Sequence, residues 1–445
     1  MTRLVAVMLA AGCLAAGCQV LDPYNMIGRQ LGEATPPPTE FVPAPGPASL
    51  TRAQRLQAFD AVWNTVEERY HDPAYNGVDW KAVGARYRPL ALAAPDDDAF
   101  WDVLDRMAGE LHDSHTRVES PRQVQLRERD EAITLGFIFS PLAGKLAVTT
   151  VEPESDAWWA GVRPGMLVTA IGGVPAPAAY EKLLAETRSA STARARHFNV
   201  IRKLMNGPEG STVAFTFERA DASHFDAVLP RRVVPHRHRE IHRVLPSGYG
   251  YLRFTQWSIG LTTRAIAGLE TLKKTPGLVI DLRGNPGGLA AMIMGLAGHF
   301  VSDRAVLGVM TTKGAAAPLH FAANPRLVNA AGERVEPFSG PLAIVIDGMT
   351  GSASECFTGG MQSLGRARVF GETSMGQALP ALFDTLPNGD VFIHAWGDFV
   401  TGTGVRIEGR GVVPDQAVPL TREALLAGRD APMEAALAWI DKAKG

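Results

Sequence analysis

The chain has few cysteines, no strong excess of charge and, beyond its first residues, no long apolar run. Only three cysteines occur in 445 residues, so a disulfide framework is not expected. The net charge is −2 and there is no basic block, which argues against nucleic acid as a partner. No later apolar run reaches the roughly 20 residues that a membrane-spanning helix needs. With 46% apolar residues, the composition predicts a globular chain of two or three domains.

Nucleotide-binding and metal-binding motifs are also missing. The glycine-rich turn DLRGNPGG at 281–288 contains neither GxGxxG nor GK[ST], so a phosphate loop is a weak interpretation. An oxyanion loop is the alternative, because glycine lets backbone N–H groups approach a reacting carbonyl closely. The histidines at 236–242 are interleaved with arginines that would repel a cation, which favours a solvated basic strand over a metal site. No cofactor or metal is predicted.

Residues 1–18 resemble the signal peptide of bacterial lipoproteins. Arg3 precedes an apolar stretch that is too short to span a bilayer, and small residues stand directly before Cys18. The resemblance to a lipobox implies that Cys18 is lipidated and that the protein faces the periplasm in the bacterial cell envelope. Gln19, where an Asp would indicate inner-membrane retention, favours an outer-membrane anchor. A plain secretory signal is the alternative. The proline-rich residues 19–47 predict an extended tether.

Changes in pattern along the chain predict an α/β protein with three folded regions. Residues 48–125 place apolar side chains at helical spacing and predict an N-terminal helical domain. Residues 131–232 change to short strands. Over residues 245–422, strands alternate with helices, which is typical of an α/β layer. A C-terminal helix is expected over residues 423–445.

The middle region resembles a PDZ domain. Leu135-Gly136-Phe137 is similar to the loop whose backbone N–H groups hold a peptide carboxylate in that family, and AGVRPG at 160–165 is similar to its helix-and-turn signature. The resemblance implies that a polypeptide C-terminus would add as a strand to the edge of the domain. The segment over 180–205 is longer than usual there. The alternative is a small β domain that only packs against its neighbour.

A serine at a predicted strand-to-helix turn is the candidate nucleophile. The apolar run 343–346 predicts a buried strand, glycines break it, and a helical pattern begins at Ser352. The hydroxyl of Ser352 would lie beside the unpaired N–H groups at the positive end of the helix dipole. A helix N-cap is the alternative role, and the local pattern alone favours it. Cys356, one turn later, is expected to be a buried, inert thiol.

Three motifs together resemble the C-terminal processing (tail-specific) serine peptidase family. They are DLRGNPGG at 281–288, GSASE at 351–355 and GET at 371–373, and the resemblance covers residues 48 to about 420. It implies a crotonase-like core of the ββα type and Ser352 as the nucleophile, with Ser354 in reserve. The oxyanion hole would use the N–H groups of Gly287 or Gly288 and of Ala353.

The lysine that acts as base in the Ser/Lys branch of this family is absent. Its position is Gln377, and an amide cannot usefully accept a proton. The stretch LHDSHTR at 111–117 instead resembles the histidine motif of the tricorn-type Ser/His/Glu branch. His115 would be the general base, Ser114 would join its hydrogen-bond network, and Glu408 would orient the imidazole.

Each of these assignments has an alternative. His112 could replace His115, and His394, on a predicted strand, is a further candidate base. Glu408 could pair with Arg406 or Arg410 at the surface, where such pairs contribute little.

The sequence therefore predicts a serine endopeptidase that hydrolyses polypeptides through an acyl-enzyme. The main alternative is a non-catalytic peptide- or lipid-binding module on the same fold, which the missing lysine supports. A third possibility is acyl transfer on a non-peptide ester. The discriminating feature is whether Ser352, His115 and Glu408 converge within a hydrogen bond or one water of each other.

Overall fold

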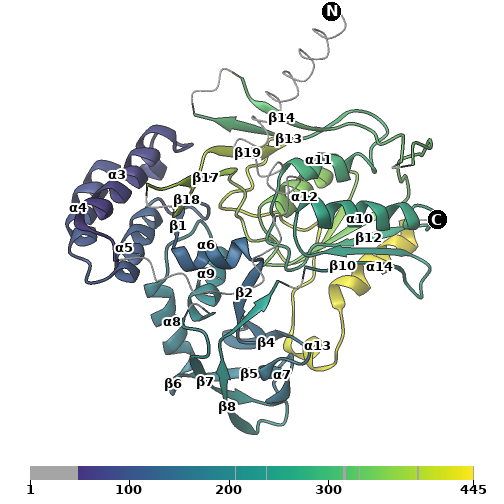
Figure 1. Ribbon diagram of the computed structural model, residues 1–445. Helices are drawn as coiled ribbons and strands as arrows, with labels where there is room; N and C mark the ends of the chain where they lie inside the picture. Colours follow the sequence, from purple (N-terminus) through teal and green to yellow (C-terminus); the bar gives the residue numbers. More distant parts are fainter. Residues whose placement is uncertain are drawn as a thin grey trace, which may run out of the picture.

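The computed structural model describes residues 49–443, apart from residues 206, 237, 314–316, 330 and 388–389. The predicted lipidation site Cys18 and the tether over 19–47 lie outside the described residues. In the part of the chain that is described, no helix combines the length and the apolar character needed to cross a membrane. A helical N-terminal region, a β-rich middle region and an α/β core can be followed in Figure 1. The predicted α/β class with an N-terminal helical region is confirmed.

The N-terminal region is a group of helices that share one apolar core. Its third long helix begins after Asp96, whose carboxylate accepts the Ala99 N–H at 2.8 Å and so caps the helix. The shared core includes Phe59 and Phe100 and continues onto Phe392 of the α/β core, so the helices pack against the rest of the molecule. The helices are α3 (Arg52–Arg69), η1 (Tyr75–Gly77), α4 (Trp80–Leu92), α5 (Asp97–Gly109) and α6 (Pro121–Glu128).

The β-rich region is a twisted antiparallel sheet with its own aromatic core. The strands run in the order β3-β4-β5-β7-β8, with β6 paired to β5, so β3 is an edge strand. A two-stranded ribbon, β2 with β9, joins the region to the core. The strands are β2 (Glu131–Thr134), β3 (Phe137–Leu142), β4 (Lys145–Val151), β5 (Leu167–Ile171), β6 (Val174–Pro175), β7 (Thr212–Glu218), β8 (His224–Pro230) and β9 (Arg232–Pro235). The helices are α7 (Asp156–Trp159), α8 (Ala176–Glu186) and α9 (Ala193–Met205).

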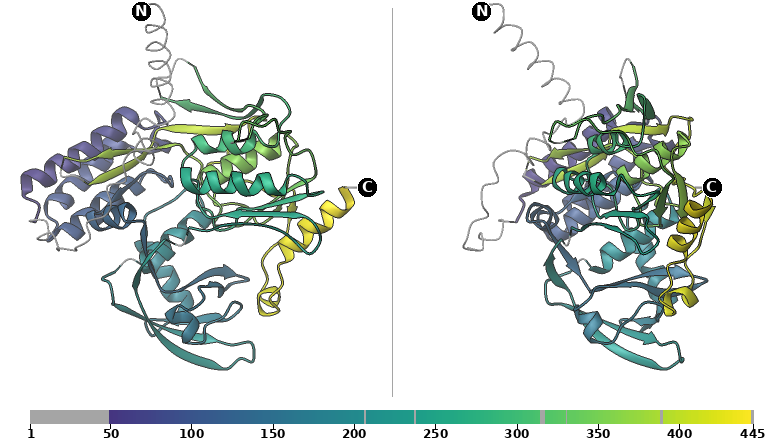
Figure 2. Two further views of the ribbon diagram at one scale, coloured as in Figure 1. Left: turned by 45° about the vertical axis from the view of Figure 1, so that its right-hand side comes forward. Right: turned by 90° about the vertical axis from the view of Figure 1, so that its right-hand side faces the viewer.

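The core is a six-stranded sheet in the order β10-β11-β12-β15-β16-β20, parallel except for the β10–β11 pair. Helices α10, α11 and α12 cover one face and α14 covers the other (Figures 1 and 2), so β12 and β15 are buried on both faces. The strands are β10 (Glu240–Val244), β11 (Gly250–Phe254), β12 (Leu278–Asp281), β15 (Leu342–Ile346), β16 (Arg368–Gly371) and β20 (Gln416–Ala417). The helices are α10 (Ile259–Leu272), α11 (Ala291–Ala297), α12 (Ala353–Ser363) and α14 (Ala431–Ala443).

Two smaller sheets connect the regions. Strand β1 (Arg117–Glu119) follows the histidine motif and pairs with β18 (Val391–Ala395), which also pairs with β17 (Ala381–Thr385). The β1–β18 ladder aligns Arg117 with Ile393 and so brings the N-terminal histidine motif to the core. The second sheet has the order β14-β13-β19, with β13 (Ala305–Thr312), β14 (Leu319–Ala323) and β19 (Gly397–Thr401).

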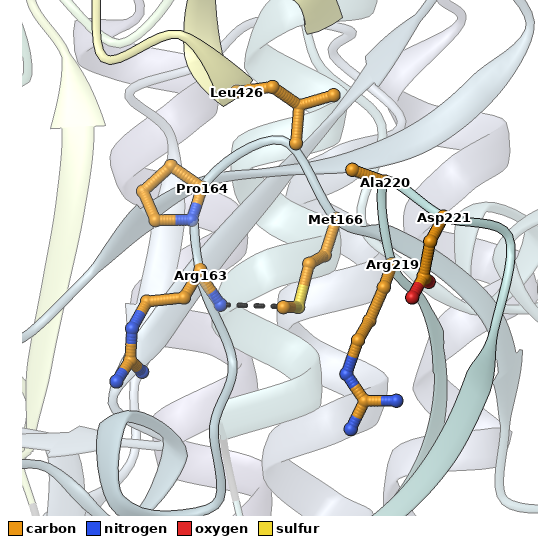
Figure 3. A pocket seen from close by; sticks show the side chains of 7 residues that line it. All are labelled: Arg163, Pro164, Met166, Arg219, Ala220, Asp221 and Leu426. Atoms are coloured by element: carbon orange, nitrogen blue, oxygen red, sulfur yellow. Dashed lines mark hydrogen bonds between the residues drawn. The ribbon is translucent and has the colours of Figure 1, made fainter.

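The short helix α13 (Arg422–Leu426), near the C-terminus of the chain, contacts the β-rich region. The Arg422 guanidinium donates to the Gly165 carbonyl at 3.0 Å and to a Glu218 carboxylate oxygen at 3.2 Å. Beside this contact lies a cavity of about 340 Å³ between the 163–166 turn, residues 219–221 and Leu426 (Figure 3). The cavity belongs to the junction between α13 and the β-rich region, and its lining includes none of the predicted catalytic residues.

Candidate active site

Ser352 lies on a sharp turn between β15 and α12. Its φ of 52° and ψ of −119° are values that non-glycine residues rarely adopt. An ordinary N-cap has an extended backbone, so helix capping alone does not explain this conformation. The Ser352 N–H donates to the Gln377 carbonyl at 2.7 Å and to a Glu355 carboxylate oxygen at 2.9 Å. The turn thus holds a half-buried hydroxyl at the start of a helix.

The reserve nucleophile Ser354 is fully buried. Its Oγ accepts the indole N–H of Trp257 at 2.9 Å, and α12 encloses it among core side chains. A hydroxyl in this position cannot reach a substrate, which leaves the half-buried Ser352 as the candidate nucleophile of the SASE motif.

A glycine cradle packs directly against Ser352. A Cβ built on Gly287 would lie 2.6 Å from the Ser352 Cβ and 2.9 Å from the Ala353 nitrogen, and one on Gly288 would lie 2.3 Å from the Trp257 carbonyl oxygen. Both glycines have a positive φ, of 105° and 136°. The Gly287 N–H already donates to the Asn285 side chain at 3.0 Å. Gly288 and Ala353 are therefore the better candidates for oxyanion donors, and Ala353 is the first residue of α12, where N–H groups lack intrahelical partners.

The Asp113 carboxylate fixes the backbone of the histidine motif. It accepts the N–H groups of His115 at 2.7 Å and Thr116 at 2.6 Å, and its second oxygen accepts the Tyr70 hydroxyl at 2.8 Å. Burial, with the nearby positive charge of Arg117, lowers the pKa of His115 to about 4. The imidazole is therefore neutral at neutral pH, the form that a general base requires.

Glu408 is buried beside the same motif. One carboxylate oxygen accepts the Ala378 N–H at 2.7 Å, and burial raises the pKa of Glu408 to about 8, with the charge of Asp113 contributing. Arg406 pairs with Asp398 at 2.6 Å. The alternative interpretation of Glu408 as a member of a surface ion pair is therefore wrong.

The loop over 374–378 joins the three segments that carry the predicted catalytic residues. The Gln377 carbonyl accepts the Ser352 N–H at 2.7 Å, and the Gln377 amide donates to the carbonyl of Ser114, next to His115, at 3.4 Å. The following residue, Ala378, donates to Glu408. Gln377 replaces the lysine of the Ser/Lys pattern and binds the nucleophile turn to the histidine motif.

Two buried polar atoms in this site are unpaired. His115 Nδ1 and Glu408 Oε1 make no hydrogen bond to any described residue, so they are not bonded to each other in this state. Their chemistry is complementary, since a neutral imidazole can donate from Nδ1 to a carboxylate. Catalytic hydrogen bonds are often long without substrate and tighten when substrate binds.

Glu355 is a site residue whose role sequence analysis missed. Its fully buried carboxylate accepts the N–H groups of Ser352, Gly376 and Gln377 and the Ser374 hydroxyl. From the sequence, Glu355 could be recognised only as the last residue of the SASE motif. Apart from Ser352, its partners lie 19 to 22 residues away in the chain and are brought to it by the β15–β16 pairing.

The segment over 188–194, which follows α8 and includes the first residues of α9, also reaches into the site and was missed. Ser191 Oγ lies 2.6 Å from Ser114 Oγ, and Thr192 Oγ1 donates to the Met375 carbonyl at 2.6 Å. Arg194 donates to the Ser374 carbonyl at 2.6 Å. The unusual length of the 180–205 segment is the one feature of the sequence that pointed here.

The remaining histidines have other partners. His112 is exposed and contacts Ser189 at 2.9 Å, and His394 is buried on β18 and contacts Asp384 at 3.1 Å. His236 stacks on His238, which pairs with Asp130. Among the described residues, no three potential metal-ligating side chains come together.

The predicted inert thiol is buried as expected. Cys356 lies inside α12, and burial raises its pKa well above the usual value. It is a poor nucleophile, because the thiolate is the reactive form.

In the loop predicted to bind a peptide carboxylate and along the edge strand β3, some backbone groups already hydrogen-bond within the protein. The Gly136 N–H donates to Thr134 Oγ1 at 2.9 Å. On β3, the Phe139 carbonyl contacts His197 Nε2 of α9 at 2.9 Å. Leu135 and Phe137 are buried in the aromatic core. A peptide that adds to this edge would meet α9.

Comparison with known families identifies two parts of the chain. Residues 248–418 match the family model of Peptidase family S41, and residues 51–109 match that of the Tricorn protease C1 domain. The chain is 24% identical over 367 residues to the carboxyl-terminal-processing protease of Picosynechococcus sp., covering 80% of this chain and 81% of that protein. It is 26% identical over 419 residues to the putative tricorn protease homolog 2 of Streptomyces coelicolor, covering 84% of this chain and 32% of that protein.

Solved structures share the fold. The photosystem II D1 C-terminal processing protease superposes with a TM-score of 0.55 at 21% identity, covering 87% of this chain and 97% of that one. Mature CPAF superposes with a TM-score of 0.63 at 14% identity, covering 88% and 96% of the two chains. The helical region, the β-rich region and the core therefore occur together in proteins of known structure.

Replacing Gly287 by alanine should abolish the reaction of Ser352 with a fluorophosphonate. The added Cβ would displace the Ser352 side chain and the Ala353 N–H, and alanine is strained at a φ of 105°. Gly295→Ala on α11, where a Cβ meets nothing within 4 Å, is the matched control and should react at the normal rate. Intact-mass spectrometry measures both. Normal labelling of Gly287→Ala would show that this cradle does not shape the site.

Proposed function

We propose that this chain, a serine-type peptidase with a family S41 domain, hydrolyses polypeptides through an acyl-enzyme on Ser352. The base is His115, oriented by Glu408, in a Ser/His/Glu arrangement. The single observation that carries this proposal is the 374–378 loop, which hydrogen-bonds to the nucleophile turn, the histidine motif and Glu408. The three residues come from separate parts of the sequence, and one loop holds their segments together.

The chemistry proceeds in two halves. Ser352 Oγ attacks the peptide carbonyl while its proton passes to Nε2 of neutral His115, and the imidazolium then protonates the leaving amine. Water, deprotonated by the same imidazole, hydrolyses the ester and releases Ser352. The N–H groups of Gly288 and Ala353 stabilise the oxyanion in both halves. Ionised Glu408 accepts the Nδ1–H of His115 and stabilises the imidazolium.

The substrate we propose is a polypeptide bound near its C-terminus. The names of the relatives, carboxyl-terminal-processing proteases, support this choice, as does the resemblance of residues 131–232 to a PDZ domain. The Gly136 loop and the β3 edge would receive the chain end, after His197 has moved from the Phe139 carbonyl.

A non-catalytic binding module on this fold is the less favoured alternative. A binding module has no need for a strained serine packed against glycines that tolerate no Cβ, or for a buried carboxylate with an unpaired oxygen. Strained, unsatisfied groups of this kind gather where chemistry is done. The replacement of lysine by Gln377, which favours the binding module, is offset by the neutral imidazole of His115.

Labelling with a fluorophosphonate tests the nucleophile and the base without a known substrate. The full-length chain should be modified at Ser352, Ser352→Ala should not react, and His115→Ala should react at least 100-fold more slowly, since a positioned base contributes about 10²–10⁴-fold. His112→Ala is the matched control and should react within about twofold of the unmodified chain, because the exposed His112 side chain contacts Ser189 at 2.9 Å and not the proposed catalytic residues. Peptide mapping by mass spectrometry locates the adduct. Loss of labelling in His112→Ala, with labelling retained in His115→Ala, would contradict the role of His115 and show that His112 is the base.

The labelling rate should rise with pH through the neutral range. The folded-state pKa of Glu408 is raised to about 8 and that of His115 is lowered to about 4, so imidazole is already neutral and ionisation of Glu408 limits the reaction. The rate at pH 9 should exceed that at pH 7 by about tenfold, the ratio of the ionised fractions. The midpoint belongs to the interacting pair and not to one residue. Glu408→Gln should lower the rate and remove this rise; an unchanged pH profile would contradict the role of Glu408.

We also propose that the protein is a lipoprotein of the bacterial envelope, anchored through Cys18. The string of small residues before Cys18 supports this location. Cys18→Ser should release the protein from the membrane fraction of expressing cells, as measured by centrifugation and immunoblotting, whereas Cys356→Ser, which changes a buried thiol, should leave it there. Membrane association of Cys18→Ser would contradict the anchor.

A further inference from the structure

The hydroxyl-rich segment 188–194 of the β-rich region lies between the histidine motif and the 374–378 loop. The buried Arg188 guanidinium donates to the carbonyls of Asp113 and Thr116 at 3.0 Å each, one on either side of His115. On the other flank, Thr192 and Arg194 donate to carbonyls of the 374–378 loop. The segment is therefore fixed at both ends, with Ser191 in the middle.

Ser191 makes its contacts inside the candidate active site. Its Oγ lies 2.6 Å from Ser114 Oγ and donates to the Gly376 carbonyl at 3.1 Å, and its N–H donates to Ser114 Oγ at 3.3 Å. The Ser191 hydroxyl also lies against the Glu408 carboxylate and opposes the rise in the pKa of Glu408 caused by burial. Ser191 thus contacts the residue before the proposed base and the proposed orienting carboxylate.

We propose that Ser191 is a positioning residue for catalysis, supplied by the β-rich region, which links Ser114 to Glu408. This inference rests on the proposed function of Ser352, His115 and Glu408. When Ser191 donates its hydroxyl proton to the Gly376 carbonyl, Ser114 must be the donor in the short contact between the two serines. The Ser191 proton then has two possible acceptors, the Gly376 carbonyl and the Glu408 carboxylate. An ionised carboxylate is the stronger acceptor. When Glu408 ionises, the Ser191 hydroxyl therefore donates to the carboxylate, and a continuous chain of hydrogen bonds runs from Ser114 through Ser191 to Glu408.

Ionisable groups from several elements surround this carboxylate. Asp113 and Glu355 raise the pKa of Glu408, and Glu408 in turn raises the pKa of Tyr70 and of Cys356. The Ala378 N–H donates to one carboxylate oxygen, the other oxygen makes no hydrogen bond to any described residue, and the neighbouring Ser191 hydroxyl lowers the pKa of Glu408. The Arg406 guanidinium lies nearby, but it donates to the Glu408 backbone carbonyl at 3.4 Å and pairs with Asp398, so it does not replace the Ser191 hydroxyl at the carboxylate. Removal of the Ser191 hydroxyl should therefore disfavour the ionised form of Glu408.

The test compares Ser191→Ala with Ser191→Thr and Ser189→Ala in the full-length chain. The fluorophosphonate rate at Ser352 is measured from pH 6 to pH 10, and a peptide substrate, once one is found, gives kcat and KM. Ser191→Ala should react about 10- to 100-fold more slowly at pH 7, since hydrogen bonds to charged groups are among the stronger ones, and its rate should rise at a higher pH than normal. Ser191→Thr keeps a hydroxyl and should restore both the rate and the pH profile.

Ser189→Ala is the matched control, because Ser189 contacts His112 in the same segment. It should leave the rate and the pH profile unchanged. A Ser191→Ala profile with the normal midpoint, or an equal loss in Ser189→Ala, would overturn the inference and leave the proposed function standing. Absence of labelling in the unmodified chain would overturn both. Thermal unfolding of each variant separates a shifted profile from loss of folded protein.

Discussion

The buried carboxylate of Glu355 is the contact on which the geometry of the site depends. A carboxylate without water is costly unless several donors surround it, and here backbone N–H groups and one hydroxyl supply them. Burial still raises the pKa of Glu355. Because its donors come from both the Ser352 turn and the 374–377 loop, the carboxylate fixes the two relative to each other, and everything attached to that loop is fixed with them.

The attachments of the loop run to the other regions of the molecule. Ala378 binds Glu408, Gln377 binds the carbonyl of Ser114, and the segment 188–194 binds the carbonyls of Ser374 and Met375. The β1–β18 ladder brings the histidine motif to the core from a different direction. The helical region, the β-rich region and the core therefore meet at one loop. A displacement of the β-rich region would therefore change the contacts of Ser114.

The sequence predicted the parts of this site that are encoded locally. The strand, the glycines and Ser352 are adjacent in the chain, as are Asp113, Ser114 and His115, so pattern and resemblance were enough to select them. Residues that act through distant contacts were not predictable. Ser191 and His197 have ordinary surroundings in the sequence and gain their partners from folding. Glu355 belongs to the GSASE motif, but most of its partners also come from a distant segment.

The replacement of lysine by Gln377 explains why those distant contacts are needed. A lysine in the loop would bring a base on the same segment that holds the Ser352 turn. Glutamine brings no base, yet its backbone keeps the bond to Ser352 and its amide reaches the Ser114 carbonyl. The proposed base must then come from the N-terminal region. Its placement depends on the contacts between the regions, and each of these contacts consists of a few hydrogen bonds. Catalysis in such a site depends on how the regions are docked, and the nucleophile turn alone is not sufficient.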